Sequence, residues 1–247
     1  MNILAIVNPK GGGGKTTSAV SIAAVLGAMG QRVLLIDLDP QAGASLSLGV
    51  RDPGESILQA MHRTTAFPVV PTKAPGVSLV PSGHALTAAR RHFSGEIGAG
   101  LFKRCLDRTE NDREWVIIDC PPGDDILILG ALRAAEHVLI PLETTYLGLT
   151  GLWQIIDTIE EMRNDGGRAE ILAVIPCRAH PERPHHRKIM EKLGNLFPRR
   201  VTPFVREDDD IAMAPSAGLP ITLYAPGSAG TADYRRVVDF LQGILRE

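Results

Sequence analysis

A run of four glycines flanked by lysines is the part of this 247-residue chain best suited to chemistry. Residues 8–17 read NPKGGGGKTT, between the apolar run Ile3–Val7 and a helix-like run that starts at Thr16. Glycine allows the backbone to turn its N–H groups toward a ligand at close range, and the start of a helix adds positive charge. A flexible linker is the alternative, but a linker would not lead directly into GKTT and an apolar helix. The run therefore predicts a phosphate-binding loop.

Each residue of this loop has an expected part in binding a nucleotide. Lys15 supplies a full positive charge for the β- and γ-phosphates, and the hydroxyl of Thr16 is suited to Mg²⁺. The phosphates would also contact the rest of the loop, which comprises Gly11, Gly12, Gly13, Gly14 and Thr17. Hydrolysis needs further groups, because a phosphate-binding loop alone neither holds Mg²⁺ nor positions a water molecule.

Three aspartates provide the carboxylates that such a site needs. Asp37 and Asp39 follow the apolar run Val33–Ile36, and their spacing of two lets both point to one side at a strand end. An ordinary strand-ending Asp-Pro turn is the alternative for this pair. Asp119 ends another apolar run and precedes CPPG. An acidic residue at the end of a buried strand is typical of the Walker B position, where the carboxylate holds the shell of Mg²⁺.

Short apolar runs alternate with helix-length stretches along the chain. Each apolar run is continuous, which is typical of strands buried on both faces of a parallel sheet. The expected strands are Ile3–Val7, Val33–Ile36, Val116–Ile118, His137–Ile140 and Ile171–Ile175, and the expected helices are Thr16–Met29, Asp124–Ala135, Leu149–Asn164 and Thr231–Leu245. The prolines of residues 68–81 favour a loop there. We therefore predict a single α/β domain, residues 1–247, with a mostly parallel sheet and helices on both faces.

Composition limits the class of function. The formal net charge of −2 excludes a uniformly basic nucleic-acid binder, so any contact with DNA must come from a local basic patch. The three cysteines form no CxxC pair, which favours a reduced cytoplasm over a disulfide-stabilised protein. The sequence shows neither a signal peptide nor an apolar run long enough to span a bilayer, so we expect a cytoplasmic protein that does not use a membrane.

The glycine-rich loop resembles the deviant Walker A motif, KGGxGKTT, of the ParA/MinD family of ATPases. An ordinary P-loop has glycine where this chain has Pro9, and the deviant motif has a signature lysine at the position of Lys10. In that family the signature lysine reaches the phosphates bound to a second subunit. The resemblance therefore implies a P-loop NTPase fold that binds ATP and Mg²⁺, and a homodimer that closes around ATP.

The aspartates are similar to those of the same family. The segment DLDPQ, residues 37–41, resembles the family's DxDPQ, and residues 115–122 resemble its hhhhDxPP pattern. The resemblance implies that Asp39 orients or activates the attacking water and that Asp37 lies near Mg²⁺. It also implies that Asp119 holds the Mg²⁺ shell. Lys10, Lys15 and Asp39 would then be the catalytic residues.

Two further stretches resemble the Soj-like ParA branch of the family. Residues 140–152 are similar to the family's IPVQ…E(Y/F)xALEGL stretch, and residues 214–230 to its EAPSxGxxI…YxPxSxGA ending. This branch implies a ParB-like activator and an ATP-bound dimer that binds nonspecific DNA on the bacterial nucleoid. It places the adenine contacts near Pro176, Arg178 and Arg206. The mixed charges of the closing helix favour docking over the membrane binding of the MinD branch, and we expect no added N-terminal DNA-binding domain.

One segment departs from the Soj-like pattern. Soj-like proteins carry IPRNVR shortly before EAPS, whereas Glu207–Asp210 stand where arginines are expected. Acidic side chains repel a phosphate backbone, although they can also cap a following helix. Another basic surface could replace these arginines, either Arg235 and Arg236 or the cluster Arg178, Arg183, Arg187, Lys188, Lys192, Arg199 and Arg200. An ordinary solvated helix face is the alternative for that cluster.

Several functions remain open on these residues. The leading hypothesis is a Mg²⁺-ATP-dependent ATPase of DNA partitioning, with slow hydrolysis that a partner stimulates. A second is a positioning ATPase for a protein cargo such as a chemoreceptor cluster or a carboxysome. A third is a nucleotide-switched scaffold with negligible turnover, against which Lys10 and Asp39 argue. The histidines His180, His185 and His186 lack a companion cysteine or acid at ligand spacing, so they do not predict a metal site.

Overall fold

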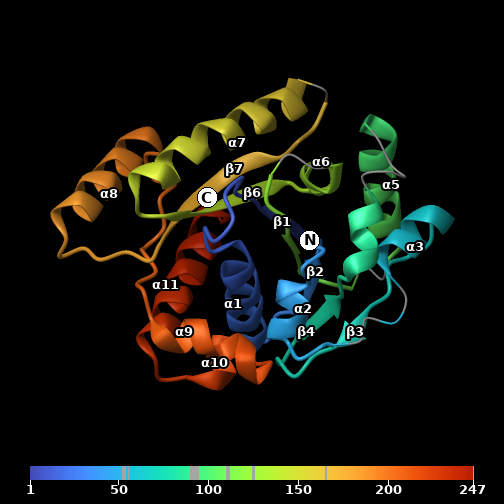
Figure 1. Cartoon of the computed structure of the whole chain (residues 1–247), viewed down its shortest axis with the longest axis horizontal. Helices are drawn as coiled ribbons and strands as arrows, with labels where there is room; N and C mark the ends of the chain where they lie inside the picture. Colours follow the sequence, from blue (N-terminus) through green and yellow to red (C-terminus); the bar gives the residue numbers. More distant parts are fainter. Residues whose placement is uncertain are drawn as a thin grey trace.

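Seven strands form one sheet in the computed structural model, which describes residues 1–51, 54, 56–89, 95–109, 112–123, 126–164 and 166–246 (Figure 1). Within these residues the strand order is β3-β4-β2-β5-β1-β6-β7. The bounds are β1 Asn2–Ile6, β2 Val33–Asp37, β3 Val70–Pro71, β4 Val77–Val80, β5 Trp115–Asp119, β6 His137–Glu143 and β7 Glu170–Cys177. Neighbouring strands are parallel except β3 and β4. The predicted α/β class with a mostly parallel sheet is therefore confirmed.

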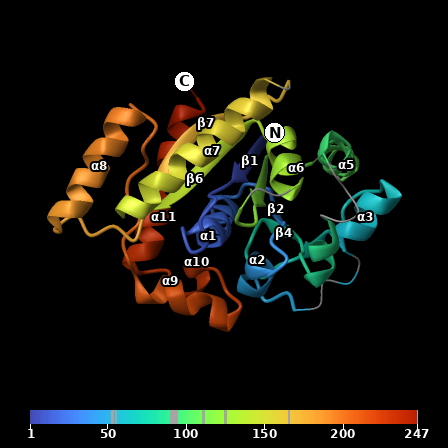
Figure 2. The same cartoon turned by 45° about the horizontal axis from the view of Figure 1, so that its top comes forward.

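Helices cover both faces of this sheet. Apolar residues of α3, α5, α6, α7 and α8 belong to the core on one face, and those of α1, α10 and α11 to the core on the other. Figures 1 and 2 show α8 at the opposite end of the molecule from α3 and α5. The bounds are α1 Lys15–Ala28, α2 Gly43–Ser47, α3 Ile57–Arg63, α5 Gly95–Arg108, α6 Ile126–Ala134, α7 Tyr146–Asn164, α8 Pro184–Leu196, α9 Asp209–Met213, α10 Ile221–Tyr224 and α11 Ala229–Ile244, with 3₁₀ turns η1 His84–Ala88 and η2 Ala214–Ala217.

Burial on both faces explains the continuous apolar runs of the strands. In β1, Ile3 and Ala5 belong to the core on one face, whereas Leu4 and Ile6 belong to the core on the other. Successive side chains of a strand point to opposite faces, so a strand covered on both faces has apolar residues at every position. All five predicted strands are present, and each ends within three residues of its predicted bounds.

The register of the central strands brings the candidate carboxylates to one place. Strand β1, which precedes the glycine-rich loop, lies between β5 and β6. Ile6 at the end of β1 is aligned with Asp119 at the end of β5, and Asp37 at the end of β2 is aligned with Asp119 from the other side. Because parallel strands end at the same edge, the loop and both aspartates meet at the carboxyl edge of the sheet.

The prediction of a loop over residues 68–81 is wrong. Strands β3 and β4 lie there, and β4 pairs in parallel with β2, so that Val77 is aligned with Val33. Prolines flank β4 without interrupting it, and Pro71 lies in the edge strand β3, where a missing N–H is tolerated. The run Val77–Val80 is short, so its strand conformation depends on pairing with β2 more than on its own pattern.

The four predicted helices are present as α1, α6, α7 and α11. Helix α7 begins at Tyr146, earlier than the predicted Leu149, and the predicted start of α6 at Asp124 lies outside the described residues. The other helices, including α8, are additions that the apolar pattern did not reveal. In the part of the chain that the structure describes, no helix combines the length and the apolar character needed to cross a membrane. That residues 1–247 form a single domain stays a prediction.

A buried carboxylate joins the last helix to the segment after the sheet. Asp233 in α11 accepts hydrogen bonds from the backbone N of Arg206 at 3.0 Å, from its Nε at 2.7 Å and from its Nη2 at 2.8 Å. Arg236 donates to the same carboxylate. Burial by itself would raise the pKa of Asp233, but the hydrogen bonds and charge of Arg206 outweigh it and hold the pKa below its ordinary value.

We expect Asp233→Asn to lower the free energy of unfolding at pH 7 by roughly 2 kcal/mol, less than for a fully buried pair because both arginines are partly exposed. A carboxyl group whose pKa is lowered in the folded state stabilises the fold at pH values above its ordinary pKa. This contribution is lost as the pH falls below about 4. Urea denaturation at pH 7 and pH 3 checks this, and the gap between wild type and variant should narrow on acidification. A gap of equal size at both pH values would contradict the ionised state of Asp233.

Helix α1 approaches the loop before β4 so closely that Gly27 leaves no room for a side chain. A Cβ at Gly27 would lie 2.1 Å from the Pro75 carbonyl oxygen and 2.9 Å from Val77 Cγ2. We expect Gly27→Ala to destabilise the fold by roughly 1–3 kcal/mol, although alanine is the better helix former. The matched control is Gly243→Ala in α11, where a Cβ would meet nothing within 4 Å. Thermal unfolding should separate the two variants, and equal midpoints would contradict the predicted clash.

Candidate nucleotide-binding site

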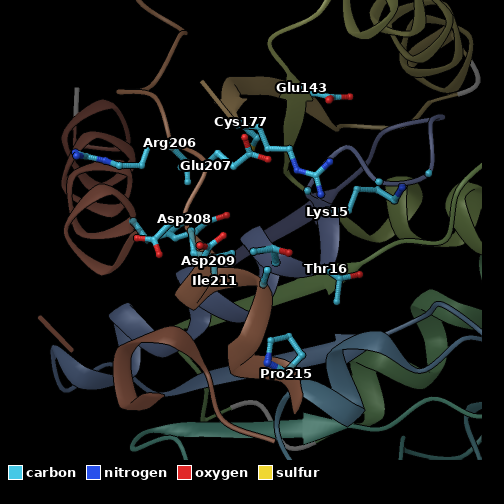
Figure 3. Close-up of a pocket in the computed structure, with 18 of the residues that line it drawn as sticks. Lys15, Thr16, Glu143, Cys177, Arg206, Glu207, Asp208, Asp209, Ile211 and Pro215 are labelled. Atoms are coloured by element: carbon cyan, nitrogen blue, oxygen red, sulfur yellow. The ribbon is translucent and has the colours of Figure 1, made fainter. Parts of the chain in front are cut away.

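A pocket of about 370 Å³ opens at the carboxyl edge of the sheet, beside the glycine-rich loop (Figure 3). Its lining comes from distant parts of the sequence: Lys15 and Thr16 begin α1, Asp39 follows β2, and Glu143 ends β6. Figure 3 shows Lys15 and Thr16 between Glu143 on one side and Pro215 on the other. The pocket therefore brings together the predicted loop and the predicted carboxylate Asp39.

The backbone of the loop requires glycine at several positions. Gly12 and Gly14 have φ values of +79° and +92°, which side chains of L-residues rarely adopt. A Cβ at Gly13 would lie 2.6 Å from Asn8 Nδ2, and one at Gly14 would lie 3.1 Å from Cys177 Sγ. The glycines therefore let the chain turn sharply between β1 and α1 while it packs against β7.

Asn8 fixes the loop to the neighbouring strand, a role that the sequence did not reveal. Its Nδ2 donates a hydrogen bond to the Pro141 carbonyl oxygen in β6 at 2.5 Å, and its Oδ1 accepts one from the backbone N of Lys10 at 2.9 Å. Asn8 is 5% exposed. A buried amide between an apolar strand and a glycine run was the available signal, because buried polar groups need partners.

Lys15 is buried in the loop at 6% exposure. Its Nζ donates hydrogen bonds to the carbonyl oxygens of Asn8 at 3.0 Å and Lys10 at 3.1 Å. Burial lowers the pKa of Lys15, while the nearby charge of Asp119 raises it. The loop thus curls around its own ammonium group and holds it at the wall of the pocket, where it can meet a phosphate.

Asp119 is fully buried, and neither of its carboxylate oxygens has a hydrogen-bond partner among the described residues. Burial, and next the charge of Asp37, raise the pKa of Asp119 well above its ordinary value, while the Thr16 hydroxyl and Lys15 act in the opposite direction. An orphaned buried carboxylate near a threonine hydroxyl fits Mg²⁺, which takes few protein ligands and completes its shell with phosphate and water. The predicted metal residues Thr16 and Asp119 therefore suit the ion.

Asp37 differs from Asp119 because protein donors already satisfy it. Its Oδ2 accepts hydrogen bonds from the backbone N and the Oγ of Ser45, both at 2.7 Å, and its Oδ1 accepts one from the backbone N of Asp39 at 3.2 Å. Burial raises the pKa of Asp37 to about 6. Asp37 lies next to Asp119, but its hydrogen bonds anchor the loop after β2 and leave less room for direct binding of an ion.

Asp39 is held in the pocket wall by its neighbours. Its Oδ1 accepts a hydrogen bond from the backbone N of Gln41 at 2.9 Å, and its carbonyl oxygen accepts one from Ser82 Oγ at 2.6 Å. The backbone N of Ser82 in turn donates to Ser45 Oγ at 3.0 Å. A serine network that the sequence did not single out thus links Asp37 to Asp39. The Asp39 carboxylate is partly exposed and can reach a ligand or a water molecule.

Lys10 lies at the rim of the site and does not line the pocket. Its Nζ is 3.8 Å from Glu143 Oε2, and its side chain is 43% exposed. In the single chain the signature lysine therefore faces a carboxylate of its own subunit.

The residues expected near adenine have different surroundings. Arg178 lines the pocket, whereas Pro176 lies within β7 and is not part of the lining. Arg206 lines the pocket with part of its surface, but its guanidinium is bound to Asp233, and Figure 3 shows it directed away from Lys15 toward α11. Tyr234 also borders the pocket, but it is buried at 1% exposure, and its hydroxyl lies 3.2 Å from Ser18 Oγ.

The acidic segment lies in the pocket wall. Glu207, Asp208 and Asp209 all line the pocket, next to Arg206. Asp208 caps α9 through the backbone N of Asp210 and also accepts a hydrogen bond from the backbone N of Gly230 at 2.6 Å. Of the two interpretations of these acids, helix capping is the one that this geometry supports.

His180 contacts two acidic residues, and one of them, Glu207, is remote in sequence. His180 Nε2 lies 2.9 Å from Glu207 Oε2, and this hydrogen bond lowers the pKa of Glu207. His180 Nδ1 lies 3.2 Å from Glu182 Oε1. In the described part of the chain, no group of three or more His, Cys, Asp or Glu side chains is arranged to hold a metal ion. The cluster instead joins the segment after β7 to the pocket wall.

Comparisons with known proteins bear on the whole chain. Residues 1–171 match a family model described as an AAA domain, AAA_31. The chain is 31% identical to the chromosome partitioning protein ParA of Caulobacter vibrioides, over 96% of this chain and 92% of that protein. It is also 31% identical to the chromosome-partitioning ATPase Soj of Thermus thermophilus, over 99% of this chain and 96% of that protein.

A solved structure shares the fold over the whole chain. Cobyrinic acid a,c-diamide synthase from Mycobacterium smegmatis, with bound ADP and magnesium, is 28% identical and has a TM-score of 0.83, covering 100% of this chain and 96% of that chain. The similarity therefore extends over the sheet, the glycine-rich loop and the closing helices. On this evidence the chain belongs to the ParA/MinD family of P-loop ATPases.

Proposed function

We propose that this protein is a Mg²⁺-ATP-dependent ATPase that dimerises with ATP and partitions DNA. The observation that carries the proposal is the unpartnered Asp119 carboxylate, which lies close to Thr16 and Lys15 at the phosphate-binding loop. A buried carboxylate without a partner is costly to the fold unless a ligand completes its surroundings. The similarity to ParA and Soj supports partitioning as the purpose of that ligand binding.

The loop and helix α1 bind the triphosphate of ATP in this proposal. Lys15 exchanges its carbonyl partners for β- and γ-phosphate oxygens, and the start of α1 adds partial positive charge. Thr16 and Asp119 would hold Mg²⁺ through the hydroxyl and the carboxylate. When bound, Mg²⁺ neutralises charge on the phosphate oxygens during transfer. Lys15 stabilises the same charge from the protein side.

Asp39 positions the attacking water. Its Oδ1 accepts a hydrogen bond from the backbone N of Gln41, and its Oδ2 would accept one from the attacking water. Ser45 and Ser82 keep the loop that carries Asp39 at a fixed place relative to Asp37. Such positioning contributes to rate because the reacting groups no longer have to find each other.

Lys10 acts across a dimer interface. It lies at the rim of the pocket with a partly exposed side chain, which is the place from which a lysine can reach a second subunit. A lysine that enters a closing interface offsets phosphate charge and works in surroundings from which water is excluded. ATP would therefore join two copies of the chain, and hydrolysis would release them.

Helix α8 is the surface that we propose for DNA. Arg178 lines the nucleotide pocket and Arg236 is bound to Asp233, so neither belongs to an open basic face. The basic residues that α8 and its flanks expose are Arg183, Arg187, Lys188, Lys192, Arg199 and Arg200. Phosphate contacts from such a face bind DNA without sequence preference. A ParB-like activator would stimulate hydrolysis, and the ATP-bound dimer would associate with the nucleoid in the cytoplasm.

A positioning ATPase for a protein cargo is the second candidate. The observation that favours it is the acidic segment Glu207–Asp210, which stands where Soj-like proteins carry arginines and reduces the positive charge available to DNA. The chemistry at the phosphates would be the same in both functions. The identity of the surface that the ATP-bound dimer binds separates them.

We expect Asp39→Ala to bind ATP and to accumulate as an ATP-bound dimer, with hydrolysis slowed by roughly 10²-fold or more, because the water loses its positioning carboxylate. Lys15→Ala is the companion variant, and it should lose nucleotide binding and therefore the dimer. Phosphate release and size-exclusion chromatography with ATP check both variants. Hydrolysis by Asp39→Ala at the wild-type rate would show that the assigned role of Asp39 is wrong.

We expect the wild-type protein to bind nonspecific duplex DNA with ATP but not with ADP, with an affinity that falls as salt rises. Lys188→Glu combined with Lys192→Glu in α8 should weaken this binding at least tenfold. The control is Lys103→Glu in α5, another exposed lysine, at the opposite end of the molecule (Figures 1 and 2). Fluorescence anisotropy measures all three proteins. An ATP-bound dimer that binds no DNA would favour the protein-cargo function instead.

A further inference from the structure

The signature lysine has a carboxylate partner within its own chain. Lys10 Nζ lies 3.8 Å from Glu143 Oε2, and the two side chains are 43% and 29% exposed. An ion pair at this distance and exposure is weak, because solvent screens it and both side chains can adopt other positions. Lys10 can therefore exchange Glu143 for another anion.

Backbone contacts place both members of the pair. Asn8 joins the backbone N of Lys10 to the Pro141 carbonyl oxygen, so the base of Lys10 is fixed against β6, the strand that Glu143 ends. After Glu143, the backbone N and the Oγ1 of Thr144 donate to the carbonyl oxygen that ends β7, at 3.1 and 3.0 Å. The backbone of both residues is thus held in place, so that their side chains stay within reach of each other.

Glu143 also belongs to the wall of the pocket in which phosphates would bind. Its side chain lines the same pocket as Gly11, Lys15 and Thr16 (Figure 3). A carboxylate at this position repels a phosphate unless a cation neutralises it. In the single chain that cation is Lys10.

We propose that Glu143 is the intrachain counter-ion of Lys10. In the single chain, Lys10 neutralises the Glu143 carboxylate at the phosphate pocket, and Glu143 keeps Lys10 on its own subunit until Lys10 binds the phosphates of a second ATP-bound copy. Glu143 is then a positioning residue that acts through Lys10. The transfer of Lys10 to a second copy rests on the proposed function. The neutralisation of Glu143 by Lys10 beside the phosphates takes place within one chain and does not require the dimer.

A double-mutant cycle on ADP binding tests the single-chain part, since ADP does not require the dimer. The proteins are wild type, Glu143→Gln, Lys10→Gln and the double variant, and the readout is the Kd for a fluorescent ADP. Lys10→Gln should weaken ADP binding about two- to fivefold, the range for a partly exposed ion pair, because Glu143 is left unpaired beside the phosphates. Adding Glu143→Gln should restore the affinity, whereas Glu143→Gln in the wild-type background should change it little.

Sedimentation with a non-hydrolysable ATP analogue tests the dimer part. Glu143→Gln should lower the dimer Kd about two- to fivefold when Lys10 is present, because closure no longer has to separate the pair. It should have no effect in the Lys10→Gln background. The matched control is Glu160→Gln, which removes the same charge from an exposed position on α7 and should leave both readouts unchanged.

Each arm has a result that overturns the proposal. If the double variant binds ADP no better than Lys10→Gln, Glu143 does not act on the phosphates through Lys10. If Glu143→Gln weakens the dimer, Glu143 serves the closed state and does not restrain Lys10 before closure. If the wild-type protein forms no dimer with the ATP analogue, the proposed dimer function fails, while the ADP cycle still decides the role of the pair.

Discussion

Charge buried at one edge of the sheet is the constraint on which the rest of the structure depends. Lys15 is 6% exposed and Asp119 is 0% exposed, and Asp37 is aligned with Asp119 on the neighbouring strand. Burial disfavours charged forms, which lowers the pKa of Lys15 and raises the pKa values of both aspartates. Such groups gain most from a ligand that carries phosphate together with a divalent cation. The site is therefore arranged for binding at some cost to stability.

Short polar side chains hold the segments around these charges. Asn8 binds the loop after β1 to β6, Ser45 binds the loop after β2 to Asp37, and Ser82 extends that link to the loop after β4. The backbone N of Gly123 after β5 donates to the Pro9 carbonyl oxygen at 3.2 Å. Each loop at the carboxyl edge is thus bonded to a neighbour. A pocket built in this way loses little freedom when a nucleotide enters, which favours affinity.

The end of the pocket beside α9 and α11 has a different construction. There the wall comes from the segment after β7 and from residues that precede α9, and charge pairs between remote residues hold it in place. Arg206 is bound to Asp233 of α11, and Glu207 is bound to His180. These pairs use up charges that would otherwise face solvent or DNA. The position of any DNA-binding surface therefore depends on which basic side chains the fold leaves exposed, and α8 and its flanks carry one cluster of them.

The sequence alone was enough to predict the α/β class, five of the strands and the glycine-rich turn between β1 and α1, because apolar runs, glycine spacing and strand-end aspartates are local patterns. It did not determine β4, whose conformation depends on pairing with β2, nor the partner of Arg206. The tertiary structure also decided that Asp37 is satisfied by Ser45 while Asp119 is left without a partner, and that Lys10 faces Glu143. Each of these features depends on which residues from separate parts of the chain lie close together. Only the packing of the strands and the loops that follow them sets such distances, so no local pattern records them.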